Sequence, residues 1–150
     1  MEKAFDFTLQ DQQGNEVSLH DFKGQKVVVY FYPKDSTPGC TKQACSYRDH
    51  FEQLKERKIK VIGISKDSVA SHQKFMAKQE LNFTLLSDPE LKAIQAYDVW
   101  KEKNMYGKKV MGVVRTTFVI DEEGNILHRF DKVKPDKDVE QVLELIDSLS

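Results

Sequence analysis

The sequence has no long apolar run, almost no net charge and only two cysteines. Its longest apolar run is the six residues 27–32, whereas a membrane-spanning helix needs about 20. The formal net charge of -1 and the pI near 6.4 predict no attraction to nucleic acid or to a membrane surface. No apolar stretch follows a basic start at the N-terminus, so no secretory signal is predicted and a cytoplasmic location is expected.

Metal and cofactor signals are also missing. Structural disulfides are rare in the cytosol, so the two cysteines, Cys40 and Cys45, are expected to be catalytic, metal-bound or inert. The two cysteines have no histidine partner at zinc-binding spacing, and Gly107 and Gly112 fit neither a dinucleotide-binding motif nor a P-loop. We therefore expect no metal and no cofactor. The histidines are interpreted as solvated or as hydrogen-bonded within the fold: His20, His50, His72 and His128.

What is present indicates one α/β domain over residues 1–150. Hydrophobic residues make up 39% of the 150 residues, enough for a sizeable core, and no repeat or linker divides the chain. Periodicity and turn residues predict the order of elements. They are an N-terminal hairpin (5–19, turn at 11–15), a strand (27–32), a helix (from about 40), a strand (60–65), a helix (67 or 68 to 79), a short strand (83–86), a helix (90–97), a loop with possible strand (104–112), a hairpin (115–121 and 126–130) and a final helix opened by Pro135.

This order is that of a thioredoxin-like fold with a hairpin added in front and a helix–strand–helix insertion in the middle. Its centre is the segment from the buried strand 27–32 to the helix that begins near Cys40. Apolar side chains of that helix recur at helical spacing and include Cys40; they are Cys40, Ala44, Tyr47, Phe51 and Leu54.

The two thiols are predicted to have different surroundings. Cys40 lies in the first turn, where the positive end of the helix favours a thiolate. Cys45 lies about 140° around the helix at 100° per residue. That position places it among Asp49, Glu52 and Glu56 on the polar side.

The spacing Pro33, three residues, Thr37, two residues, Cys40 identifies a family. It resembles the signature of the peroxiredoxins, and residues 31–41 resemble the bacterioferritin-comigratory (Q-type) branch. Residues 114–121 are similar to the arginine-bearing strand of that branch, so Arg115 completes the set. One departure is Gln43, where this branch often has glutamate, and it should alter the hydrogen bonding near the thiol.

The resemblance implies a thiol peroxidase that reduces hydrogen peroxide and organic hydroperoxides. Cys40 is then the nucleophile that becomes a sulfenic acid, with Arg115 favouring the thiolate because a guanidinium stays charged. Thr37 would place its hydroxyl near both the sulfur and the peroxide oxygen. The substrate loop would be shaped by Pro33, Pro38 and Gly39, leaving the Gly39 and Cys40 amides to point at the peroxide.

The resemblance also gives Cys45 the role of the resolving thiol. Residues five apart in a helix have Cα atoms about 8–9 Å apart, beyond the reach of about 7 Å of a disulfide. The helix therefore has to open when the Cys40–Cys45 disulfide forms. Thioredoxin or a similar dithiol would reduce that disulfide, and a monomer is expected.

Three alternatives stay open at this level. Cys40 could be an inert buried cysteine, and Cys45 an incidental surface thiol. A general disulfide oxidoreductase is another interpretation, although that class normally has Cys-x-x-Cys at the strand-to-helix turn. A peroxide-sensing redox interaction module is the third, in which disulfide formation changes a partner surface.

Overall fold

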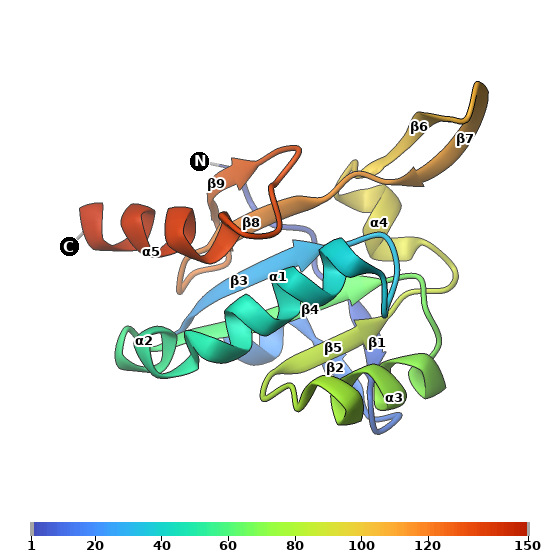
Figure 1. Cartoon of the computed structure of the whole chain (residues 1–150). Helices are drawn as coiled ribbons and strands as arrows, with labels where there is room; N and C mark the ends of the chain where they lie inside the picture. The colour runs from blue at the N-terminus through green and yellow to red at the C-terminus, as the bar shows by residue number, and fades with distance from the viewer. Residues whose placement is uncertain (1, 150) are drawn as a thin grey trace.

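The computed structural model describes residues 2–149, and these contain a seven-stranded sheet with the strand order β2-β1-β5-β4-β3-β8-β9 (Figure 1). The predicted thioredoxin-like α/β fold is confirmed. The strands of this sheet are β1 (Thr8–Asp11), β2 (Glu16–Ser18), β3 (Lys26–Phe31), β4 (Ile59–Ser65), β5 (Thr84–Ser87), β8 (Thr116–Ile120) and β9 (Ile126–Phe130). The helices are η1 (Leu19–Phe22), a 3-10 turn, and α1 (Pro38–Asp49), α2 (Phe51–Glu56), α3 (Val69–Gln79), α4 (Lys92–Ala96) and α5 (Asp138–Ser148).

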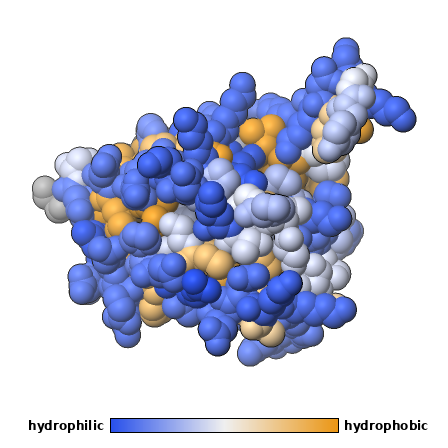
Figure 2. Space-filling view, viewed as in Figure 1, coloured by the Kyte–Doolittle hydropathy of each residue, from blue (hydrophilic) through white to orange (hydrophobic). Residues whose placement is uncertain are grey.

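Residues 104–112, predicted as loop with possible strand, lie within a second, two-stranded sheet. Strands β6 (Trp100–Met105) and β7 (Lys108–Val113) pair antiparallel and stand off the body of the molecule (Figures 1 and 2). Tyr106 and Gly107 connect them with φ angles of 53° and 80°. Two consecutive positive φ angles match the tight turn that suits a twisted hairpin. Polar side chains along both strands hide the alternation that would mark a strand in the sequence.

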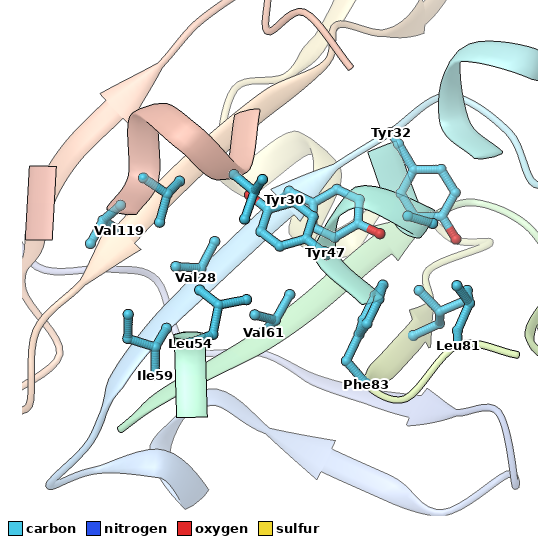
Figure 3. Packing of buried hydrophobic residues seen from close by; sticks show 14 of the residues in the cluster. Val28, Tyr30, Tyr32, Tyr47, Leu54, Ile59, Val61, Leu81, Phe83 and Val119 are labelled. Atoms are coloured by element: carbon cyan, nitrogen blue, oxygen red, sulfur yellow. The ribbon is translucent and has the colours of Figure 1, made fainter. Parts of the chain in front are cut away.

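Strand β3 runs through the middle of the main sheet, parallel to β4 and antiparallel to β8. Its side chains alternate between two cores, because successive residues of a strand point to opposite faces. Val28 and Tyr30 belong to the core beneath α1, α2, α3 and α5 (Figure 3). Val27, Val29 and Phe31 belong to the core on the face covered by α4. Both faces are buried, which explains the unbroken apolar run in the sequence.

Tyr30 fixes the position of α1 on the sheet. Its ring stacks on Tyr47 of α1, with centroids 4.9 Å apart and an interplanar angle of 9°. The neighbouring residue on β4 is Gly63, where a Cβ atom would lie only 2.9 Å from the Tyr30 ring. A glycine is therefore needed at this position to make room for the tyrosine that supports the helix.

The predicted helix from Cys40 to Leu54 is two helices. It begins at Pro38, which follows the extended N-cap residue Thr37, and it breaks at His50. His50 has φ -99° and ψ 14°, and its Nδ1 lies 2.7 Å from the Ser46 carbonyl oxygen. The apolar stripe continues across this break, so periodicity alone did not reveal it.

Other predicted boundaries also shift. The helix predicted over 90–97 is the shorter α4, and the last helix begins at Asp138 rather than at Pro135. A turn closed by the Lys137 amide on the Lys134 carbonyl precedes it. The predicted N-terminal hairpin is present as β1 and β2, and β1 pairs with β5. In residues 2–149, no helix has the length and apolar character that crossing a bilayer requires.

Candidate active site

Cys40 lies where the chain leaves β3 and enters α1. The Thr41 amide donates to the Thr37 carbonyl at 2.8 Å, which is the first turn of the helix. Within residues 2–149, the amides of Gly39 and Cys40 make no hydrogen bond. These free donors and the positive end of the helix favour an anion at this point. The Cys40 side chain itself is 2% exposed.

Arg115 faces the Cys40 sulfur. It precedes β8 rather than lying within the predicted strand, and its carbonyl accepts from the Val133 amide at 2.9 Å. Its Nη1 donates to Cys40 Sγ at 3.3 Å. A guanidinium this close favours the charged form of the sulfur. The structure therefore brings together the two residues on which the sequence prediction most depends.

Gly39 leaves room for this guanidinium. A Cβ atom at Gly39 would lie 3.1 Å from Arg115 Nη2 and 3.5 Å from Pro135 Cγ. Any larger side chain there would push the guanidinium away from Cys40. The need for glycine here is steric, since its φ is not in the left-handed region.

Gln43 joins Arg115 to a buried carboxylate. Its Oε1 accepts from Arg115 Nη1 at 2.7 Å, and its Nε2 donates to Asp138 Oδ2 at 2.9 Å. An amide suits this position because it can accept from one neighbour and donate to the other. A glutamate would face Asp138 with a second carboxylate. The departure from the family pattern therefore fits its neighbours.

Asp138, the first residue of α5, is completely buried, and sequence reasoning missed it. Besides Gln43, its Oδ2 accepts from the Tyr47 hydroxyl at 2.6 Å and from the Thr117 hydroxyl at 2.8 Å. Gln141 Nε2 donates to its other oxygen at 3.0 Å. Burial, and then the charge of Asp138, raise the pKa of Tyr47 well above its usual range, so this hydroxyl stays a donor.

Thr37 is the N-cap residue of α1, and its hydroxyl does not bond to the sulfur in the described part of the chain. It donates to the Lys34 carbonyl at 2.9 Å instead. Its only proton is then used within the loop, so toward a peroxide the oxygen can act as an acceptor. Pro33 is half-buried and Pro38, at the first helical position, is exposed.

Lys103 of β6 supplies a second cation, which sequence reasoning also missed. Burial lowers the pKa of Lys103, the Arg115 guanidinium lowers it further, and the Cys40 sulfur acts in the opposite direction. Its aliphatic chain packs on Gly112 of β7, where a Cβ atom would lie 3.3 Å from Lys103 Cδ. The hairpin thus brings a positive charge into the electrostatic range of the thiol.

Cys45 is not on the solvent side of α1 as predicted. It is half-buried against the end of α3, and its Sγ donates to Gln79 Oε1 at 3.5 Å. Arg48 Nη1 donates to the Gln79 carbonyl at 2.6 Å. The end of α3 covers this side of α1, and the break at His50 places the predicted neighbours Glu52 and Glu56 in α2. Both cysteines are free thiols.

No cluster of histidine, cysteine or acidic side chains suited to a metal ion occurs in residues 2–149. Two of the histidines lie in hydrogen bonds inside the fold, His50 on Ser46 and His72 on Asp35, while His20 pairs with Asp6 at the surface. Three surface cavities of about 200, 230 and 390 Å³ do not include Cys40 among their lining residues.

Comparison with known proteins agrees with this arrangement. Residues 1–129 match the model of the AhpC/TSA family. Peroxiredoxin Bcp of Bacillus subtilis is 45% identical over 149 residues, which cover 99% of this chain and 95% of the relative. Peroxiredoxin Bcp of Escherichia coli K12 is 48% identical over 128 residues, covering 85% of this chain and 82% of the relative.

Solved structures show the same likeness. A structure of the bacterioferritin comigratory protein of Xanthomonas campestris superposes with a TM-score of 0.91 at 39% identity, covering 97% of this chain and 92% of the other. A structure of Peroxiredoxin Q from the same organism gives a TM-score of 0.91 at 40% identity, with the same coverage. The chain belongs to the AhpC/TSA family and, within it, to the Q-type peroxiredoxins, which are thiol peroxidases.

Proposed function

We propose that Cys40 attacks the peroxide as a thiolate and that Cys45 resolves the product. The observation that carries this proposal is the Cys40 sulfur in the first turn of α1 with the Arg115 guanidinium at 3.3 Å. The substrates are hydrogen peroxide and organic hydroperoxides. Alkyl peroxide reduction by the Xanthomonas campestris relative supports the second class.

In the first step the Cys40 thiolate donates an electron pair to the nearer peroxide oxygen. The O–O bond breaks, the sulfur becomes a sulfenic acid, and the other oxygen leaves as alkoxide or hydroxide and takes a proton from water. The free amides of Gly39 and Cys40, together with Arg115, are placed to stabilise the negative charge that develops on the oxygens. The Thr37 oxygen accepts a hydrogen bond from the peroxide O–H group and so orients the substrate. Pro33 and Pro38 restrict the conformations of the loop.

In the second step the Cys45 thiolate attacks the Cys40 sulfenic sulfur. A disulfide forms and hydroxide leaves. An external dithiol, for which thioredoxin is our candidate, then reduces the disulfide to two thiols and is itself oxidised. Cycling of this kind needs a reducing compartment, which supports the cytoplasm as the location. Because both thiols belong to one helix, resolution needs no second subunit, and we infer a monomer.

Steady-state peroxide consumption tests the proposal, with the purified chain, thioredoxin, thioredoxin reductase and a nicotinamide reductant. We expect sustained turnover that stops when thioredoxin is left out. A disulfide oxidoreductase would reduce insulin without consuming peroxide, and a sensor would be oxidised once and stop. Either result would contradict the proposal.

A further inference from the structure

Asp35 is buried in a loop whose neighbouring residues are exposed. It is 5% exposed, whereas Lys34 and Ser36 on either side point into solvent. The Tyr32 hydroxyl donates to its Oδ1 at 2.6 Å. Its Oδ2 accepts from the Ser71 hydroxyl at 2.8 Å. Because several donors bond to this buried carboxylate, they hold this part of the loop in one position.

His72 of α3 is the remaining partner of this carboxylate. It is completely buried, with Nδ1 2.7 Å from Asp35 Oδ2 and Nε2 3.0 Å from the Leu86 carbonyl oxygen. A carbonyl only accepts, so Nε2 carries a proton. The contact between Nδ1 and Oδ2 requires another proton between the two atoms. The two buried side chains are therefore joined by a hydrogen bond of 2.7 Å, and each satisfies the other's buried polar group.

The same loop adopts a backbone conformation that needs support. Ser36 follows Asp35 and has φ 63°, in the left-handed region that a non-glycine residue seldom occupies. Thr37 comes next, and the Asp35 amide is itself held by Asp67 Oδ2 at 2.9 Å. Side-chain and main-chain bonds to Asp35 thus fix the chain just before the residues proposed to bind the peroxide.

We propose that the Asp35–His72 pair is a positioning device for the peroxide-binding loop. It ties the loop to α3 and to the end of β5, and so holds Thr37 at the distance from Cys40 that the peroxide requires. This inference rests on the proposed function of Cys40 and Thr37. It concerns the placement of the peroxide and not the reactivity of the sulfur, since Arg115 donates to the Cys40 sulfur while the hydrogen bonds of Asp35 and His72 in residues 2–149 go to neither residue.

The decisive variant is Asp35→Ala, measured with two reagents on the same protein. The rate constant of Cys40 with hydrogen peroxide should fall by roughly tenfold to a hundredfold, while alkylation of Cys40 by iodoacetamide changes by less than about twofold. Iodoacetamide needs the thiolate but not the loop. Equal loss in both reactions would overturn the proposal, and so would an unchanged peroxide rate.

Asp35→Asn is the conservative variant. Its amide can accept from Tyr32 and donate to the Nδ1 of a neutral His72, so it should recover most of the peroxide rate. The matched control is Ser68→Ala, which removes the side-chain acceptor at the N-cap of α3, bonded to the Ser71 amide at 3.1 Å, without touching Asp35. If Ser68→Ala loses as much peroxide reactivity as Asp35→Ala, general loosening of α3 is the cause and the positioning role is wrong.

Two further measurements cover the case in which Asp35→Ala does not fold. Ser71→Ala removes one donor to the carboxylate and should give a smaller loss, again with peroxide alone. In the unmodified chain, proton NMR should show a far-downfield, slowly exchanging signal from the proton shared by His72 Nδ1 and Asp35 Oδ2, and its absence would overturn the pairing. If the native Cys40 itself does not react with peroxide, the proposed function fails, whatever the state of His72.

Discussion

The two cysteines lie on the same helix, and the two faces of that helix on which they lie are held very differently. On the face of Cys40, buried groups interlock: Gln43 links Arg115 to Asp138, and Tyr47 bonds to the same carboxylate. On the face of Cys45 the bonds are fewer and partly exposed, and they reach the end of α3. The face with the thiol proposed to attack is fixed, while the face with the thiol proposed to resolve is lightly tethered.

Hydrogen bonds to buried charged groups contribute about 1.5–3 kcal/mol each, against about 0.5–1.5 kcal/mol for ordinary ones. Asp138 accepts four bonds inside the protein. Cys45 makes one weak thiol bond to Gln79. A peroxide site needs reacting atoms held to within a fraction of an ångström, whereas a resolving thiol needs to travel. Substitutions in α1 and its neighbours can therefore be ranked by how much each is expected to slow the reaction of Cys40 with peroxide.

The largest expected effect is that of Cys40→Ser. We expect peroxide reduction to be lost while the fold is retained, because a serine hydroxyl can fill the buried site but does not ionise at working pH. Peroxide consumption and circular dichroism are the measurements. A variant that keeps activity within tenfold of the parent, about 1.4 kcal/mol in barrier, would show that Cys40 is not the nucleophile.

Arg115→Ala comes next. Removing the guanidinium takes away the charge beside the sulfur and leaves Gln43 Oε1 without its donor. We expect the peroxide rate to fall by about 10²–10³, the scale of losing one preorganised donor, and alkylation of Cys40 at neutral pH to slow as well. Stopped-flow kinetics measures both. Arg57→Ala, which breaks a surface pair with Asp147, is the matched control and should change neither rate.

A smaller, more selective effect is expected of Thr37→Val. The change keeps the side-chain shape and removes the oxygen that faces the peroxide. The peroxide rate should fall by about thirtyfold, or about 2 kcal/mol of barrier, with alkylation unchanged. Thr8→Val, which removes a hydroxyl bonded to Ser18 in the N-terminal hairpin, serves as control. Parallel loss of peroxide reaction and alkylation would instead mean that Thr37 acts by capping α1.

The sequence predicted the central strand and the thioredoxin-like order because a strand that is buried on both faces appears as a continuous apolar run. Such a run can be recognised without knowing which strands pair with it. It gave residues 104–112 only as loop with possible strand, because the many polar side chains of β6 and β7 hide the alternation. It did not predict the break at His50, across which the apolar stripe continues. Boundaries shifted where a turn, as at Pro135, resembles the start of a helix.

The site divides in the same way. Local spacing pointed to Cys40 and Thr37, and the resemblance of residues 114–121 pointed to Arg115, which lies against the Cys40 sulfur. Their catalytic roles stay predictions. Asp138 was missed because an acidic residue in the first turn of a helix normally indicates a favourable dipole contact in solvent. Asp35 looked like an ordinary loop residue, and only its contact with His72, 37 positions away, gives it meaning. Long-range contacts between polar groups leave no periodic pattern in a single sequence.

The smallest expected effect on the first step is that of Cys45→Ser, and it tests the other face of the helix. Its rate with peroxide should stay within about twofold of the parent, because Cys45 is not among the groups around the reacting sulfur. Turnover with thioredoxin should stop, with Cys40 left as a sulfenic acid or paired with an outside thiol. Continued turnover would mean that another thiol resolves the sulfenic acid.

In the unaltered protein, oxidation should open α1. The helix contains both cysteines, so their Cα atoms lie about 8–9 Å apart, beyond the reach of a disulfide. Opening this segment breaks the bonds of Cys45 and Arg48 to Gln79 and a few helical hydrogen bonds, at a cost on the order of 1 kcal/mol for each bond. It also strains the bonds of Gln43 and Tyr47 to Asp138, which cost about 1.5–3 kcal/mol each if they break.

Amides from Thr41 to Tyr47 should therefore exchange with solvent much faster in the oxidised protein than in the reduced one. Peroxide-treated Cys45→Ser, which cannot form the disulfide, should keep them protected and is the control. If these amides stay protected in the oxidised chain, the disulfide does not join Cys40 to Cys45. Mass spectrometry of the unreduced peptides then identifies the true partner, and the contrast between the two faces of α1 would no longer explain the different roles proposed for the two thiols.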